Sequence, residues 1–151
     1  MKTIAEGAQA PDFELPDQDG IPRRLSTLVQ GGPVVLFFYP AAFTPGCTKE
    51  ACHFRDLGAD FNKAGVQRIG ISADAVEKQN SFSAKHSFDY PLLSDTERTV
   101  AESYGVKRSF ITPVKRATFV IDPDMMIRKI ITSEVRMDLH ADEALAAAEG
   151  L

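Results

Sequence analysis

The segment Pro33–Tyr39, an unbroken apolar run, limits the fold more than any other part of the sequence. As a strand it would present hydrophobic side chains to both faces of a sheet, because successive side chains point to opposite sides. Such a strand belongs in the centre of a sheet that is covered on both faces. The run is far too short to cross a bilayer. The chain is therefore expected to fold as a soluble α/β protein.

Strand and helix patterns alternate along the rest of the chain. Helices are predicted at residues 46–65, 75–86, 97–104 and 139–148, and strands at residues 13–15, 21–25, 66–72, 90–93, 117–121 and 126–132. The turn Asp17–Gly20 joins the first two strands into an N-terminal β-hairpin. The predicted architecture is a mixed central β-sheet flanked by helices. Since neither a repeat nor a linker divides the chain, residues 1–151 are expected to form one domain.

The composition excludes several classes of protein. Hydrophobic residues make up 44% of the 151 residues and charged residues 25%, as in ordinary globular proteins. The net charge of −4 gives no reason to expect nucleic-acid binding. Met1–Leu15 lacks the continuous apolar stretch of a signal peptide, so a cytoplasmic protein without a membrane partner is expected. Two cysteines there indicate catalytic, redox-active or metal-bound thiols rather than a disulfide framework.

Cys47 follows the loop Pro40–Pro45, which lies just beyond the carboxyl end of the central strand, where open α/β sheets usually place their sites. A helix beginning near Gly46 puts Cys47 in its first turn. Unpaired N–H groups and the helix dipole favour a thiolate there. An ordinary cysteine with a pKa of about 8.5 is only a few per cent thiolate at pH 7. Complete ionisation therefore raises reactivity by only about thirtyfold.

A fast reaction needs further donors around the sulfur. The hydroxyl of Thr44 and the N–H groups of the loop are expected to supply them. Pro40 and Pro45 restrict the loop, and Pro40 can shield a thiolate from water. An inert buried cysteine is the structural alternative. The Pro-x3-Thr-x2-Cys spacing after an apolar strand favours the reactive thiol.

These motifs resemble those of the peroxiredoxins, and the Cys-x4-Cys form is similar to the bacterioferritin comigratory protein (Q-type) subfamily. The matching residues are Phe38–Pro40, Thr44–Cys47 and Thr48–Asp56, with support from Ala10–Phe13, Pro91–Asp95 and Arg116–Asp122. The resemblance implies a thioredoxin-like fold and a peroxidase that reduces hydrogen peroxide and organic hydroperoxides. It makes Cys47 the peroxidatic cysteine, with Pro40, Thr44 and Arg116 completing the active site. Arg108 is the competing basic residue.

Cys52 lies five residues after Cys47, which on an α-helix separates their Cα atoms by roughly 8–9 Å and turns their side chains apart. A disulfide needs Cα atoms closer than about 7 Å. Cys52 is either inert or bonds to Cys47 only after the helix unwinds. The family resemblance implies the second, with Cys52 as resolving cysteine and thioredoxin as reductant, although glutaredoxin or another thiol donor stays open. Sulfur carries the redox change, so no cofactor is expected.

Other functions of the same residues have weaker support. The spacing of Cys47, Cys52 and His53 does not match a usual zinc finger, so no metal is expected, and His53 is interpreted as an exposed or partly packed helix residue. Glu50 and Arg55 either form a polar group around the loop or are ordinary paired residues of the helix surface. A peroxide sensor or thiol–disulfide relay would use the same two cysteines as the enzyme. A binding module without chemistry is the third alternative.

Two segments depart from the subfamily pattern. Phe43 replaces a more polar residue common in close relatives, which predicts an apolar entrance suited to bulkier hydroperoxides. The stretch Gly105–Arg116 is short for the subfamily, which counts against a dimer contact made by this loop. A monomer is expected, with at most a weak dimer.

Overall fold

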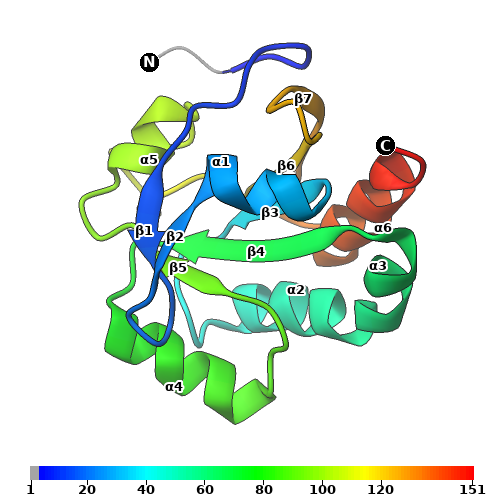
Figure 1. Cartoon of the computed structure of the whole chain (residues 1–151). Coiled ribbons are helices and arrows are strands. Elements are labelled where there is room, and N and C mark those ends of the chain that lie inside the picture. Colours follow the sequence, from blue (N-terminus) through cyan, green and yellow to red (C-terminus); the bar gives the residue numbers. More distant parts are fainter. Residues whose placement is uncertain (1–3) are drawn as a thin grey trace.

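A five-stranded sheet forms the centre of the computed structural model, which describes residues 4–151 (Figure 1). Its strands are ordered β5-β4-β3-β6-β7. The central strand β3 (Val34–Phe38) is parallel to β4 (Gln67–Ser72), which is parallel to β5 (Leu92–Ser94). On its other side β3 pairs antiparallel with β6 (Ala117–Ile121), and β6 pairs antiparallel with β7 (Ile127–Thr132). The predicted mixed sheet, with β3 at its centre, is confirmed.

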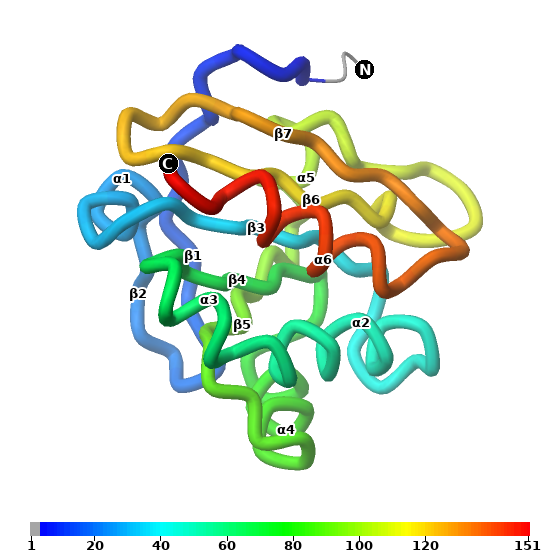
Figure 2. The backbone as a smooth tube through the Cα atoms, turned by 90° about the vertical axis from the view of Figure 1, so that its right-hand side faces the viewer, coloured from blue at the N-terminus to red at the C-terminus, as the bar shows by residue number. Residues whose placement is uncertain are grey.

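Helices cover both faces of this sheet (Figures 1 and 2). One face packs against α2 (Pro45–Asp56), α3 (Gly58–Ala64), α4 (Val76–His86) and α6 (Met137–Ala148). The other face is covered by α1 (Leu25–Leu28), the 3-10 turn η1 (Val29–Gly31) and α5 (Thr99–Ser103). A hydrophobic core lies on each face of the sheet, and successive side chains of β3 point alternately into the two. Val35 and Phe37 belong to the first core, and Val34, Leu36 and Phe38 belong to the second. This alternation is the reason for the unbroken apolar run.

The predicted N-terminal β-hairpin is present as β1 (Glu14–Pro16) and β2 (Pro22–Arg24). The buried carboxylate of Asp17 holds its turn by accepting hydrogen bonds from the N–H groups of Asp19 and Ile21, at 2.8 and 3.0 Å. The second strand ends one residue earlier than predicted because Leu25 begins α1.

The single helix predicted over residues 46–65 is wrong, because the chain breaks into α2 and α3 at Leu57 (φ −88°, ψ 11°). The physical reason is Arg68 of β4. Its Nη1 donates to the carbonyl oxygen of Phe54 at 2.9 Å, and in a continuous helix this oxygen would accept from the N–H of Gly58. A Cβ on Gly58 would lie 3.2 Å from that nitrogen, so glycine leaves room for the guanidinium.

The remaining elements lie near their predicted positions, and side-chain hydrogen bonds to the backbone lie near the starts of α5 and α6. The helix predicted at residues 97–104 is shorter, because Asp95 caps α5 by accepting from the N–H groups of Val100 and Ala101. The last helix starts two residues early, after Ser133 Oγ accepts from the N–H of Arg136. Within residues 4–151, none of the helices combines the length and apolar character that a membrane crossing requires.

Candidate active site

The active-site loop leaves the carboxyl end of β3 and enters α2. Pro40 is buried, and Pro45 occupies the first turn of the helix, where its missing N–H costs no hydrogen bond. Cys47 follows in the same turn and is only 1% exposed. The free N–H groups of that turn and the positive end of the helix dipole stabilise negative charge on its sulfur. Local sequence therefore places the thiol as predicted.

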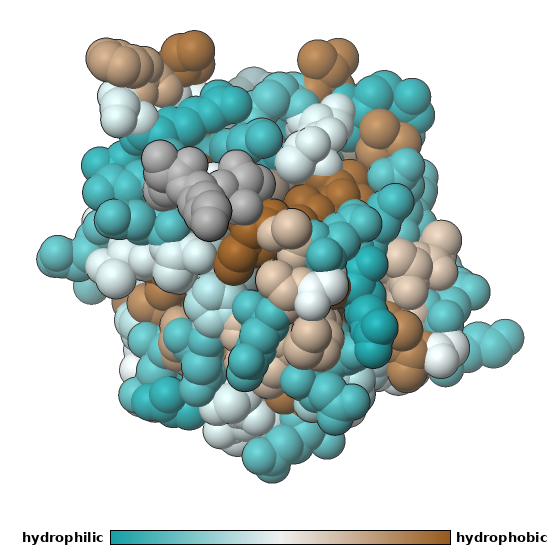
Figure 3. Space-filling model, turned by 90° about the horizontal axis from the view of Figure 1, so that it is seen from above, coloured by the Kyte–Doolittle hydropathy of each residue, from teal (hydrophilic) through white to brown (hydrophobic). Residues whose placement is uncertain are grey.

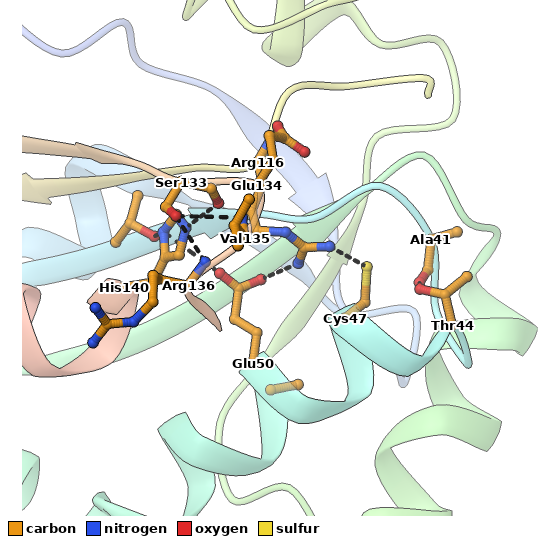
Figure 4. A network of polar contacts seen from close by, with 12 residues as sticks. Ala41, Thr44, Cys47, Glu50, Arg116, Ser133, Glu134, Val135, Arg136 and His140 are labelled. Atoms are coloured by element: carbon orange, nitrogen blue, oxygen red, sulfur yellow. Dashed lines mark hydrogen bonds and ion pairs between the residues drawn. The ribbon is translucent and has the colours of Figure 1, made fainter. Parts of the chain in front are cut away.

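Arg116, the residue immediately before β6, reaches this sulfur (Figure 4). Its Nη2 donates to Cys47 Sγ at 3.4 Å, and its Nη1 donates to Glu50 Oε1 at 2.8 Å. A Cβ on Gly46 would lie 3.2 Å from Nη2, so glycine just before the cysteine lets the guanidinium approach. Arg108, the competing candidate, forms its ion pair with Glu134 at 3.4 Å instead. The tertiary structure thus brings Arg116 to the thiol.

Glu50 lies one helical turn after Cys47 on the same face of α2 and is completely buried. Burial raises its pKa to about 8, against the opposing charge and hydrogen bond of Arg116. The predicted grouping with Arg55 is wrong: Arg55 pairs with Asp56 and donates to the carbonyl oxygen of His86. Glu50 follows Cys47 by three residues, a spacing that puts two side chains on the same face of a helix, so the sequence does indicate Glu50 at this site.

Thr44 does not contact the sulfur through its hydroxyl proton in this structure. Its Oγ1 donates to the carbonyl oxygen of Ala41 at 2.8 Å, and its side chain is exposed (Figure 4). That bond closes the loop on itself, so Thr44 keeps only acceptor capacity for an incoming ligand.

A residue that the sequence analysis missed anchors the same loop. The Oδ2 atom of Asp74 accepts from the N–H of Ala42 and from Ser72 Oγ, both at 2.7 Å. Phe43, next in the loop, has φ 68°, a strained value for an aromatic residue, and its ring centroid lies 5.1 Å from that of Phe82. Asp74 and Phe82 therefore hold the segment before Cys47 against the α4 side of the molecule. The sequence contains no local signal for either contact.

Replacing Asp74 by alanine is expected to slow the oxidation of Cys47 by peroxide about tenfold, because a loop that loses its anchor holds the thiol in reactive geometry less often. The N–H groups of residues 41–48 should exchange with solvent faster. Both effects can be measured by rapid chemical quench and hydrogen exchange. Lys78→Ala is the control, since it removes the 3.2 Å ion pair with Asp74 and leaves the bond to Ala42. Unchanged exchange in Asp74→Ala would contradict the anchoring role.

Cys52 lies half-buried in the same unbroken helix as Cys47, and both cysteines are free. Burial raises the pKa of its thiol. The helix keeps the two sulfurs on different faces, as its geometry requires. His53 is partly exposed and lies 2.8 Å from Asp142 of α6, so it is a packed surface residue as predicted. Across the described residues 4–151, no cluster of three or more His, Cys, Asp or Glu side chains is arranged to hold a metal ion.

A buried thiol at a helix N-terminus, with a guanidinium on its sulfur and a mixed sheet behind it, defines the class of thiol-dependent peroxidases with a thioredoxin-like fold. The chain belongs to the AhpC/TSA family, whose model matches residues 7–130. It is an oxidoreductase of the peroxiredoxin type, and the resemblance to Q-type proteins is confirmed. Membership implies peroxide substrates and a thioredoxin-type reductant.

Individual relatives match over nearly the whole chain. The crystal structure of peroxidoxin BcpB from Mycobacterium tuberculosis is 58% identical, with a TM-score of 0.93 and 97% of each chain covered. The bacterioferritin comigratory protein of Xanthomonas campestris is 31% identical, with a TM-score of 0.83, covering 90% of this chain and 89% of that one. Chloroplastic peroxiredoxin Q of Sedum lineare is 39% identical over 149 residues, covering 98% of this chain and 80% of the relative.

Proposed function

We propose that this enzyme reduces hydrogen peroxide and organic hydroperoxides at Cys47, forms a Cys47–Cys52 disulfide, and is recycled by thioredoxin or a similar dithiol. The observation that carries the proposal is the 3.4 Å contact between Arg116 Nη2 and Cys47 Sγ in the first turn of α2. Alkyl peroxide reduction by the Xanthomonas campestris relative supports organic hydroperoxides as substrates. The 41% exposed ring of Phe43 beside the site adds apolar surface for the bulkier ones.

In the first step the Cys47 thiolate attacks the terminal oxygen of the peroxide. The S–O bond forms as the O–O bond breaks, the sulfur becomes a sulfenic acid, and the leaving alkoxide or hydroxide takes a proton to give an alcohol or water. The Nε of Arg116 is buried with no hydrogen-bond partner among residues 4–151, so it is available to a peroxide oxygen. Thr44 Oγ1 can accept a hydrogen bond from the peroxide O–H, and Pro40 excludes water from the sulfur.

In the second step Cys52 attacks the sulfenic sulfur, which releases water and forms the disulfide. The first turns of α2 must unwind for the sulfurs to meet. Exposure of Cys52 on unwinding favours this change, because it removes the burial that raises the pKa of the thiol, so more of the thiol ionises. A dithiol then reduces the disulfide and becomes a disulfide itself.

Replacing Cys52 by serine is expected to leave the first oxidation of Cys47 intact and to stop formation of the intramolecular disulfide. Peroxide-treated protein would be alkylated and analysed by mass spectrometry, with circular dichroism recording the loss of helix that accompanies the disulfide in the wild type. Lys49→Ala, an exposed change in the same helix, is the control that should still form the disulfide. Wild-type protein in which Cys47 is oxidised while Cys52 stays free would contradict the resolving role.

The proposal extends to the location and the oligomeric state of the enzyme. We place it in the cytoplasm as a one-domain monomer, with at most a weak dimer. The face in Figure 3 is mostly polar, with hydrophobic side chains in small separate patches. The shortness of the stretch 105–116 counts against a stable dimer contact, but its Phe110 and Ile111 are 82% and 95% exposed, so any weak contact between two copies would use these two side chains.

A further inference from the structure

A buried polar cluster lies behind the Cys47–Arg116 pair and has no part in the reaction as described so far. It consists of Glu50 on α2, Thr118 on β6 and His140 on α6, and all three are 0% exposed. Figure 4 shows Glu50 between Arg116 and His140. Buried polar groups of this kind are costly unless they are paired. His140 is a titratable group next to the reaction centre, so its role needs an account.

Hydrogen bonds fix the state of the imidazole. Nε2 of His140 lies 2.9 Å from the carbonyl oxygen of Ser133, which can only accept, so Nε2 carries a hydrogen. Nδ1 faces two oxygens, Thr118 Oγ1 at 2.7 Å and Glu50 Oε2 at 3.5 Å. In the neutral ring Nδ1 is an acceptor, and in the protonated ring it is a second donor.

The Oε2 atom of Glu50 needs a hydrogen-bond partner, and Nδ1 of His140 is placed to be that partner. Its Oε1 is taken by Arg116, whereas its Oε2 has no hydrogen-bond partner in the part of the chain that the structure describes. An ionised carboxylate oxygen and an unprotonated Nδ1 would repel each other across 3.5 Å, even when Nδ1 also accepts from the Thr118 hydroxyl at 2.7 Å. A single proton between them removes the repulsion and gives the orphaned oxygen a partner.

We propose that Glu50 and His140 hold one proton between Oε2 and Nδ1, and that His140 is thereby a positioning residue for the peroxidase reaction. The proton lies either on Oε2, donating to Nδ1, or on Nδ1, donating to Oε2, and the pair is neutral in both forms. Glu50 then stays aligned on Arg116 without cancelling its charge, which remains directed at the sulfur of Cys47. The proposal rests on the proposed reaction of Cys47 with peroxide.

The charged and titratable groups around the Glu50–His140 pair set the pH at which the pair loses this proton. The groups that face it are Arg116 immediately before β6, Tyr90 before β5, Glu134 before α6 and Glu143 on α6, and Cys47 acts on Arg116 from α2. Burial raises the pKa of the Glu50 carboxyl to about 8, and burial together with the charge of Arg116 lowers the pKa of His140. One proton is therefore retained through neutral pH and released on the alkaline side. After its release the carboxylate offsets the charge of Arg116, and oxidation of Cys47 slows.

The test is the pH dependence of Cys47 oxidation by hydrogen peroxide in a single turnover, quenched by thiol alkylation and read by mass spectrometry. His140→Leu should move the alkaline fall-off to lower pH by about one unit and slow the reaction about tenfold at mildly alkaline pH. His140→Asn, which places an amide atom where Nδ1 stood, should recover most of the rate. Ala144→Gly, a buried change in the same helix, should leave the profile unmoved.

The proposal is overturned if the rate of Cys47 oxidation falls at the same alkaline pH in His140→Leu as in the wild type. It is also overturned if His140→Asn reacts no faster than His140→Leu. Nitrogen NMR of His140 gives a second reading that needs no His140 variant. Nδ1 should titrate with the alkaline limb in the wild type and at a distinctly lower pH in Glu50→Gln, and identical titrations refute the shared proton. Failure of wild-type Cys47 to react at all would instead refute the proposed function.

Discussion

Replacing Cys47 by serine is expected to abolish peroxide turnover, with a loss of about three orders of magnitude or more. A serine hydroxyl is not ionised at neutral pH, and the guanidinium of Arg116 cannot turn it into a nucleophile for the O–O bond. The measurement is peroxide-dependent oxidation of reduced thioredoxin, kept reduced by its reductase. Multiple turnovers by the wild type in this assay also separate an enzyme from a one-event peroxide sensor.

The control for Cys47→Ser is Cys52→Ser, which removes the other thiol from the same helix and should keep the rapid first oxidation of Cys47. Because the serine at position 47 is nearly the same size as cysteine, unfolding by urea should show a stability close to that of the wild type. Activity that survives in a folded Cys47→Ser protein would overturn the central assignment.

Replacing Arg116 by methionine is expected to slow the oxidation of Cys47 about a hundredfold to a thousandfold, because the reaction loses the positive charge beside its developing negative charge. The same change should destabilise the fold by about 2 kcal/mol, since it leaves Oε1 of the buried Glu50 without its hydrogen-bond partner. Stopped-flow or rapid-quench kinetics give the first value, and urea unfolding gives the second.

Two further variants separate these effects of Arg116. The double variant Arg116→Met/Glu50→Gln should regain stability without regaining rate, because the buried carboxyl is gone and the charge is still missing. Arg108→Met is the matched control and should react within about twofold of the wild type, because Arg108 pairs with Glu134 and not with the sulfur. An equal loss of rate in Arg108→Met would show that Arg116 has no special role.

The features that the sequence alone predicted are those that depend on residues close together in the chain. The apolar run at β3 identified a doubly covered central strand because every one of its side chains had to be buried. The proline-rich loop and the helix start fixed Cys47 in a first turn, where backbone N–H groups favour a thiolate whatever surrounds them. The turn residues Asp17–Gly20 also predicted the N-terminal hairpin, and the strands predicted at residues 117–121 and 126–132 are present as the paired strands β6 and β7.

The tertiary structure decided which distant side chains meet at the site. Arg68 on β4 ends α2 by taking the carbonyl oxygen of Phe54, a contact that no local pattern predicts. Asp74 anchors the loop before Cys47 from beyond β4, and His140 on α6 faces Glu50 on α2. The family resemblance implied Arg116 in preference to Arg108, and the packing of the sheet against α2 brings the guanidinium of Arg116 to the sulfur. Such contacts depend on how the sheet and helices pack, so the sequence determined the nucleophile, and packing determined the charges that tune it.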